Sequence, residues 1–144
     1  MSTQDSERKI EKTARRFYHQ LPWYELFLYP LMLVGAVFYF QGKNWGGSLF
    51  LLAGLILSMV YLMLWFYPEK GWFLRLMAVG LSFGLLGCIF TLLHMQSDVM
   101  FLVMGGLALL AALILFFSKL REQRVRGDLI RMVLVLAAVI FLLF

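Results

Sequence analysis

The sequence is poor in cysteine, histidine and charge, and each shortage excludes a class of protein. Only 15% of its 144 residues are charged, whereas an ordinary soluble domain has about 25%. Its single cysteine, Cys88, excludes an internal disulfide and any thiolate cluster around zinc or iron. Two histidines are too few for a haem pair, and the sequence has no glycine-rich phosphate loop, Ser/His/Asp grouping or zinc motif. We therefore expect no metal and no cofactor.

Apolar residues dominate the rest of the composition. They make up 62% of the chain, and the mean hydropathy is +0.85. Because a transmembrane helix needs roughly 20 mostly apolar residues, the length allows four or five crossings and little else. The pattern predicts an all-α membrane bundle of five transmembrane helices. Its parts are a polar segment at 1–22, a first hairpin at 23–67, a second hairpin at 72–117 and a fifth helix at 129–144, with turns at 41–47, 68–71 and 96–98 and a charged loop at 118–128.

The first 22 residues have an apolar face and a basic face. Apolar residues recur at helical spacing: Ile10, Ala14, Phe17, Tyr18 and Leu21. Basic residues fill the other side: Arg8, Lys9, Lys12, Arg15 and Arg16. This pattern is typical of an amphipathic helix on an anionic membrane surface, and it fits a solvated, disordered basic tail equally well. Pro22 is expected to end the segment, and the first crossing to act as an uncleaved insertion signal.

The basic residues also predict an orientation. The two sides of the expected bundle hold twelve and one of the 13 Lys and Arg residues, and the single exception is Lys43. Since Lys and Arg collect in cytoplasmic loops, the N-terminus is expected in the cytoplasm and the C-terminus outside. The net charge of +5 therefore indicates topology and not affinity for nucleic acid. The expected location is a bacterial inner membrane, with the lipid bilayer as the first partner.

A shift of 52 residues aligns the first hairpin with the second. The shift brings Gly35 onto Gly87 and Gly54 onto Gly106. Four further positions match: Leu33, Phe38, Leu55 and Leu57 meet Leu85, Phe90, Leu107 and Leu109. Both hairpins cross the membrane in the same order, so the alignment predicts a parallel repeat, with the fifth helix outside it.

The first of these hairpins resembles a known family. The resemblance rests on three stretches: Gly35-Ala36-Val37-Phe38, Asn44-Trp45-Gly46-Gly47-Ser48 and Gly54-Leu55. They are similar to small Bacteroidota membrane proteins that carry the transmembrane hairpin of the gliding-motility L protein, a subunit of the proton-driven motor of type IX secretion. The turn of that family reads approximately His-Trp-Pro-Gly, and here Asn44 and Gly46 replace the His and the Pro. The family's proton-handling glutamates do not carry over, because no acidic residue falls in the middle of an expected helix.

Ionisable residues inside a membrane are costly, so they mark candidate functional sites. Glu25, Arg75 and Arg131 each lie two or three residues inside an expected helix, at its cytoplasmic end. The repeat places Arg75 level with Trp23, so Glu25 and Arg75 are expected at a similar depth. Glu25 is expected to pair with Arg75 or Arg131 across the bundle. The alternative is that both arginines extend to the headgroups and that Glu25 reaches water.

His94 and Asp98 are four residues apart near the outer end of the third expected helix. On one helical face they could bind a metal or move a proton. A metal site needs more donors, and the turn is expected to break the helix before Asp98. We therefore interpret His94 as an interfacial residue near water.

Small residues form the most regular side-chain pattern. In a membrane they let helix backbones approach closely, where lipid gives no hydrophobic drive for association. Gly80, Gly84 and Gly87 form a stripe on the third helix. The other glycines expected at packing positions are Gly35, Gly54, Gly105 and Gly106. Packing within the bundle is the preferred interpretation over a homodimer face.

These features predict a non-enzymatic protein, an accessory or assembly subunit of a larger inner-membrane complex. Its expected partners are other membrane-protein subunits or further copies of itself. The alternative is a small oligomeric transporter or channel, which needs a polar path. Against that alternative, the helix interiors are expected to contain only Ser58, Ser82 and Thr91 as hydroxyl residues. A membrane enzyme ranks third, because its candidate groups lie at opposite faces of the membrane.

Overall fold

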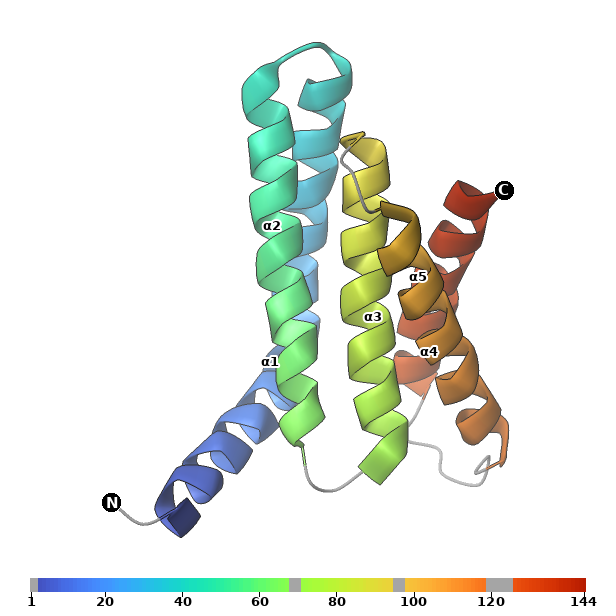
Figure 1. Cartoon of the computed structure of the whole chain (residues 1–144). Helices are drawn as coiled ribbons and strands as arrows, with labels where there is room; N and C mark the ends of the chain where they lie inside the picture. Colours follow the sequence, from blue (N-terminus) through green and yellow to red (C-terminus); the bar gives the residue numbers. More distant parts are fainter. Residues whose placement is uncertain (1–2, 68–70, 95–97, 119–125) are drawn as a thin grey trace.

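The computed structural model describes residues 3–67, 71–94, 98–118 and 126–144, with the backbone alone at 3, 98 and 126. Every regular element in this part of the chain is helical (Figure 1). The elements are α1 (Thr3–Phe40), α2 (Asn44–Met63), the short 3₁₀ helix η1 (Leu64–Phe66), α3 (Gly71–Leu92), α4 (Asp98–Ser118) and α5 (Arg126–Leu143). The turns expected at 68–71 and 96–98 and the charged loop expected at 118–128 fall largely outside the described residues.

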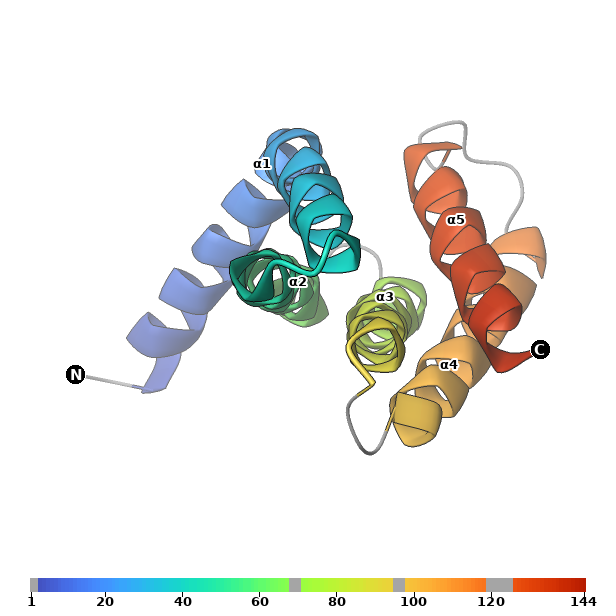
Figure 2. The same cartoon turned by 90° about the horizontal axis from the view of Figure 1, so that it is seen from above.

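The central helix of the bundle is α3. Seen from above, it lies between α1 and α2 on one side and α4 and α5 on the other (Figure 2). Small residues recur along it, and six of them are buried: Ala78, Gly80, Ser82, Gly84, Gly87 and Cys88. A helix with neighbours on both sides needs small side chains where their backbones come closest, so the sequence of α3 suits its central place.

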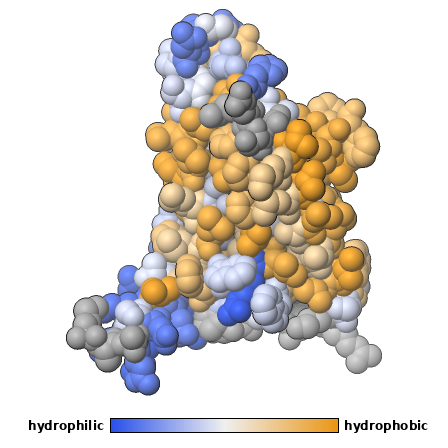
Figure 3. Space-filling model, in the orientation of Figure 1, coloured by the Kyte–Doolittle hydropathy of each residue, from blue (hydrophilic) through white to orange (hydrophobic). Residues whose placement is uncertain are grey.

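Four of the helices are long and apolar enough to cross a membrane. They are Gln4–Phe40 in α1, Asn44–Phe66 in α2 and η1, Gly71–Leu92 in α3, and Val99–Ser118 in α4. Figure 3 shows a hydrophobic band across the middle of the visible face, with hydrophilic residues toward both ends. The chain is thus a helical membrane bundle, as its composition predicts. α5 is not among these four helices, and its 18 residues include Arg126, Asp128 and Arg131.

α1 is one continuous helix across the segment boundary expected at Pro22. It runs through Pro22 and Pro30. Pro22 has no N–H for the carbonyl of Tyr18, and inside a helix such a gap produces a bend. Figure 1 shows that the N-terminal part of α1 leaves the bundle at an angle. The prediction that Pro22 ends the segment is therefore wrong, because the flanking turns continue the helix on both sides of the proline.

The apolar face of this N-terminal part packs on the protein. Ala14 and Leu21 are buried, and the ring of Tyr18 stacks on that of Tyr67 with centroids 4.8 Å apart. Ile10, farther from the bundle, is 45% exposed. Residues 3–22 are thus helical. The apolar face, which the sequence pattern predicts to contact the membrane surface, is instead largely covered by the bundle.

A tight turn joins α1 to α2, and it is shorter than the expected 41–47. Gly42 adopts a left-handed conformation with φ 79°. The amides of Gly42 and Lys43 donate to the carbonyls of Tyr39 and Phe38 at 2.9 and 3.0 Å. This is a Schellman motif, which favours glycine because glycine has no Cβ. α2 therefore begins at Asn44, and the residues up to 47 belong to the helix.

Glycines mark the closest contacts of α3 with α4 and α5. A methyl group at Gly87 would lie 2.7 Å from the backbone nitrogen of Leu102. A methyl group at Gly105 would collide with the backbone nitrogen of Gly84, and one at Gly84 would lie 3.0 Å from Val135 Cγ1. Larger side chains at these positions would push the helices apart.

The same close approach occurs in the first hairpin. A methyl group at Gly35 would lie 2.7 Å from the backbone nitrogen of Phe50. The contact between α1 and α2 therefore has the same form as the contact between α3 and α4 at Gly87 and Leu102. Each residue of one contact is 52 positions from its counterpart in the other. The remaining glycines expected at packing positions also face a neighbouring helix: Gly54 meets Ile89, Gly80 meets Leu109 and Gly106 meets Val139.

Gly105→Ala should destabilise the contact between α3 and α4. The added methyl group would collide with the backbone of Gly84, and overpacking of this kind costs about 1–3 kcal/mol. Gly106→Ala is the matched control at the next position, because its methyl group would meet only Val139, at 3.3 Å. Thermal unfolding in mild detergent should show a clear fall in Tm for the first variant and a small change for the second. Equal Tm values would contradict this packing.

Candidate functional site

Buried stripes on α1 and α5 bring charged residues together. The buried residues of α1 in this region are Leu21, Leu28 and Met32. Those of α5 are Met132, Val135 and Val139. Glu25 falls within the first stripe at helical spacing, and Asp128 and Arg131 precede the second on the same side of α5. The packing that buries the apolar residues therefore also brings these three side chains to the interior.

Glu25 and Arg131 form an ion pair across the bundle. Arg131 Nε lies 2.6 Å from Glu25 Oε1, and the two side chains are 16% and 13% exposed. Arg131 Nη1 lies 2.9 Å from Asp128 Oδ1, three residues earlier on α5. The other carboxylate oxygen of Asp128 accepts a hydrogen bond from Tyr18 Oη at 3.1 Å. A guanidinium between two carboxylates thus connects α5 to α1.

Two tyrosines extend this network into the bundle. Tyr61 of α2 donates its hydroxyl hydrogen to Glu25 Oε1 at 2.8 Å. Because that hydrogen is used, Tyr29 donates to the hydroxyl oxygen of Tyr61, 2.8 Å away. The side chain of Tyr61 is fully buried, where a phenol needs such a partner. Hydrogen bonds therefore run from Arg131 through Glu25 and Tyr61 to Tyr29.

The network lies toward one end of the helices. Glu25 precedes the end of α1 at Phe40 by fifteen residues, or about 22 Å along a helix. Arg131 precedes the end of α5 at Leu143 by twelve residues, or about 18 Å. Both charges therefore lie closer to the end of the bundle from which the N-terminal part of α1 projects (Figure 1).

Arg75 does not join this network. Its Cζ lies 5.6 Å from the ring centroid of Trp65 and 5.4 Å from that of Trp72, and the faces of the two indoles stabilise the cation. Arg75 Nε is buried and has no hydrogen-bond partner within the described chain. Of the two partners expected for Glu25, the structure brings Arg131 to it and leaves Arg75 apart.

His94 and Asp98 do not share a helix. α3 ends at Leu92, and His94 follows in a left-handed conformation with φ 53°, its amide donating to the carbonyl of Thr91 at 3.1 Å. Asp98 is the first residue of α4, and its side chain lies outside the described residues. Across the ranges that the structure describes, no three His, Cys, Asp or Glu side chains gather in a group that could hold a metal ion.

Tyr29, Tyr61 and Asp128 are not among the site residues predicted from the sequence. The hydroxyl residues expected in the interior are only serine and threonine, although both tyrosines interrupt apolar runs and a buried phenol needs a partner. Asp128 precedes Arg131 by three residues, a spacing at which opposite charges meet on a helix. Chemically, the assembled site can hold an ion pair in apolar surroundings and pass a proton between hydroxyl groups.

Arg131→Met should destabilise the protein strongly. It leaves Glu25 and Asp128 without the guanidinium between them, and breaking a buried pair costs about 3–5 kcal/mol. Arg75→Met is the matched control, because it removes an arginine near the same end of the bundle that forms no ion pair with the residues the structure describes. Thermal unfolding in detergent should show the larger fall in Tm for Arg131→Met.

A double-mutant cycle separates the ion pair from general effects of charge. Combining Glu25→Gln with Arg131→Met should cost at least about 1 kcal/mol less than the sum of the single variants, because residues in contact are coupled. Additive losses would contradict a stabilising pair.

Comparison with known proteins gives no relative to set beside this geometry. No family model, no curated protein and no solved structure matches the chain. Its function has to be inferred from its own residues.

Proposed function

We propose that this protein is a non-enzymatic accessory or assembly subunit of a larger complex in a bacterial inner membrane. The observation that carries the proposal is the pairing of Glu25 and Asp128 with Arg131. A charged group that acts on a substrate faces an accessible path, whereas these side chains are at most 16% exposed and contact one another. Ion pairs between buried side chains fix the positions of the helices, and a subunit with a structural role requires fixed helices.

The outer surface of such a scaffold is where other subunits, or further copies of the chain, would pack. It is covered by large apolar side chains, among them Phe27, Leu107, Ile114 and Phe141, each more than 60% exposed. In a membrane this surface contacts lipid, and a partner helix with complementary small residues would displace that lipid.

We infer that α5 is a fifth crossing, with the N-terminus inside and the C-terminus outside. From Met132 to Leu143 the helix has no charged residue, and its two inner charges, Asp128 and Arg131, are paired. The exposed basic residues of α1 lie at the end of the bundle where α3 and α5 begin, and Lys43 lies at the other end (Figure 1). An excess of Lys and Arg at one end supports a cytoplasmic assignment for that end.

The two hairpins are proposed to be a parallel repeat. The support is the matching contact of Gly35 with Phe50 and of Gly87 with Leu102. The first hairpin also carries the residues that resemble the Bacteroidota family, and membership of that family stays a prediction. Since Glu25 is bound to Arg131, the proposal does not include the family's proton-handling role.

A small oligomeric transporter or channel is the second candidate. One observation favours it: the hydrogen-bonded series from Glu25 through Tyr61 to Tyr29 can relay a proton part of the way through the bundle. From Pro30 to Phe38, α1 has only apolar residues. A complete path would therefore need polar groups from a second copy.

Purification in mild detergent, followed by mass spectrometry, distinguishes the two candidates. The subunit proposal predicts other membrane proteins in a fixed ratio to this chain. A homo-oligomer free of other proteins would overturn it. In that case the purified protein should move protons across liposome membranes, and Tyr61→Phe should abolish the flux by removing one hydroxyl. Tyr24→Phe is the matched control, because its hydroxyl bonds to Gln20 outside the network.

Single cysteines test the orientation. Cys88 is buried, and Cys88→Ser gives a background free of thiols. Glu7→Cys and Phe144→Cys then place one thiol at an exposed position near either end. In intact cells a membrane-impermeant maleimide should label Phe144→Cys at once and Glu7→Cys only after permeabilisation. Labelling of both positions from the same side would mean that α5 does not cross.

A further inference from the structure

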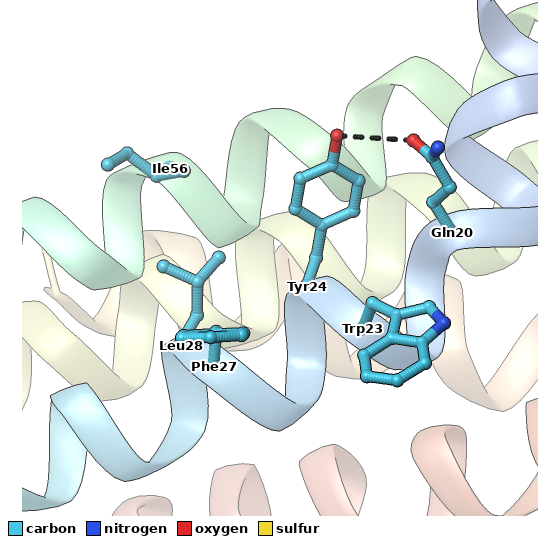
Figure 4. Close-up of a pocket in the computed structure, with 6 residues that line it drawn as sticks. All are labelled: Gln20, Trp23, Tyr24, Phe27, Leu28 and Ile56. Atoms are coloured by element: carbon cyan, nitrogen blue, oxygen red, sulfur yellow. Dashed lines mark hydrogen bonds between the residues drawn. The ribbon is translucent and has the colours of Figure 1, made fainter.

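A groove opens on the outer surface of the bundle between α1 and α2. Its volume is about 410 Å³. The residues that line it are Gln20, Trp23, Tyr24, Phe27, Leu28 and Ile56 (Figure 4). Trp23 and Phe27 are 66% and 76% exposed, so the groove faces the surroundings of the bundle.

The groove changes from polar to apolar along α1. Gln20 and Tyr24 lie at its N-terminal end, where Tyr24 Oη is 3.5 Å from Gln20 Oε1. Phe27, Leu28 and Ile56 lie at the other end (Figure 4). A molecule that fills it should therefore be polar at one end and apolar at the other.

A stripe of positive charge leads into the polar end. Lys9, Lys12 and Arg16 are exposed and follow one another at spacings of three and four residues, and Gln20 is four residues further on. Residues at these spacings lie on one face of a helix. We call Lys9, Lys12 and Arg16 the basic stripe. It continues along α1 into the groove through Gln20 and Trp23.

Two of the three acidic residues in this part of α1, Glu7 and Glu11, lie on another side, whereas Asp5 lies on the face of the stripe at the end farther from the groove. At about 100° per residue, Glu7 projects roughly 180° and Glu11 roughly 140° away from Arg16. Ala14 and Leu21 project within about 40° of Glu7 and are buried against the bundle. The bundle therefore occupies the side opposite the basic stripe and leaves the stripe open.

We propose that the basic stripe and the groove together bind an anionic phospholipid. The headgroup phosphate lies at Lys12 and Arg16, where a guanidinium can hold two phosphate oxygens at once. The amide of Gln20 and the hydroxyl of Tyr24 face the glycerol backbone and ester groups of the lipid. An acyl chain lies along Trp23, Phe27 and Ile56. The site is independent of the proposed role as a subunit, because it uses none of the Glu25 network.

The length of the site matches this occupant. Arg16 and Phe27 are eleven residues apart, or about 16 Å along a helix, which takes a lipid from its headgroup into its acyl chain. A zwitterionic lipid carries its own cation beside the phosphate, whereas an anionic lipid leaves its phosphate to the protein. An acidic peptide would match the basic stripe but would leave the apolar end of the groove unfilled.

Native mass spectrometry of the full chain in mild detergent tests the charge requirement. Given equal amounts of phosphatidylglycerol and phosphatidylcholine, the wild-type protein should retain phosphatidylglycerol preferentially. Lys12→Gln with Arg16→Gln should reduce that preference roughly tenfold to thirtyfold, since each basic residue contributes about a fivefold effect near a membrane surface. Arg8→Gln with Arg15→Gln is the matched control, because it removes the same charge from the flank of the stripe and should change the preference little.

A second pair of variants tests the groove. Trp23→Ala should weaken phosphatidylglycerol binding several-fold, whereas Leu26→Ala should not, because Leu26 is equally exposed at 63% but does not line the groove. All variants must keep the wild-type Tm. Equal losses in the stripe and flank variants would overturn the site in favour of diffuse surface charge. Binding of an acidic peptide in place of phosphatidylglycerol, or no preference in the wild-type protein, would overturn it as well.

Discussion

Close contact between helix backbones holds this bundle together. Inside a membrane, an apolar side chain gains little by leaving lipid for another helix, so association depends on packing that lipid tails cannot match. Glycine provides that packing here, with Gly87 against Leu102 and Gly105 against Gly84. The positions of the other elements follow, because α3 sets where α4 and α5 can lie. Val135, one turn after Arg131 on α5, packs against Gly84, and this contact helps to place Arg131 opposite Glu25.

The polar network adds specificity to this packing. Small residues allow helices to approach, but several rotations of a helix can satisfy such a contact. The ion pair of Arg131 with Glu25 forms at one rotation of α5, at which Asp128 also reaches Tyr18. Tyr61 connects the same carboxylate to α2. α1, α2 and α5 thus share one set of hydrogen bonds near one end of the bundle.

Most of the fold could be predicted from the sequence because it depends on local features. Apolar runs of membrane length give α2, α3 and α4 to within a few residues, and the packing glycines follow from their spacing. The expectation that proline ends the helix fails at Pro22, because the helical turns on either side of it continue the helix. The choice between Arg75 and Arg131 as the partner of Glu25 could not be made from sequence. It depends on which helices face each other and on Trp65 and Trp72, which surround Arg75 from positions before and after the turn.

The separation of Glu25 from Arg131 along the chain affects how the protein is made. The two residues are 106 positions apart. A ribosome that adds about 5–20 residues per second makes Arg131 roughly 5–20 s after Glu25. During that interval Glu25 can find Tyr61 in its own hairpin but not Arg131, the cation that it pairs with in the finished bundle. The first hairpin is therefore synthesised with an acid whose partner is still unmade, and α5, which is made later, supplies that partner.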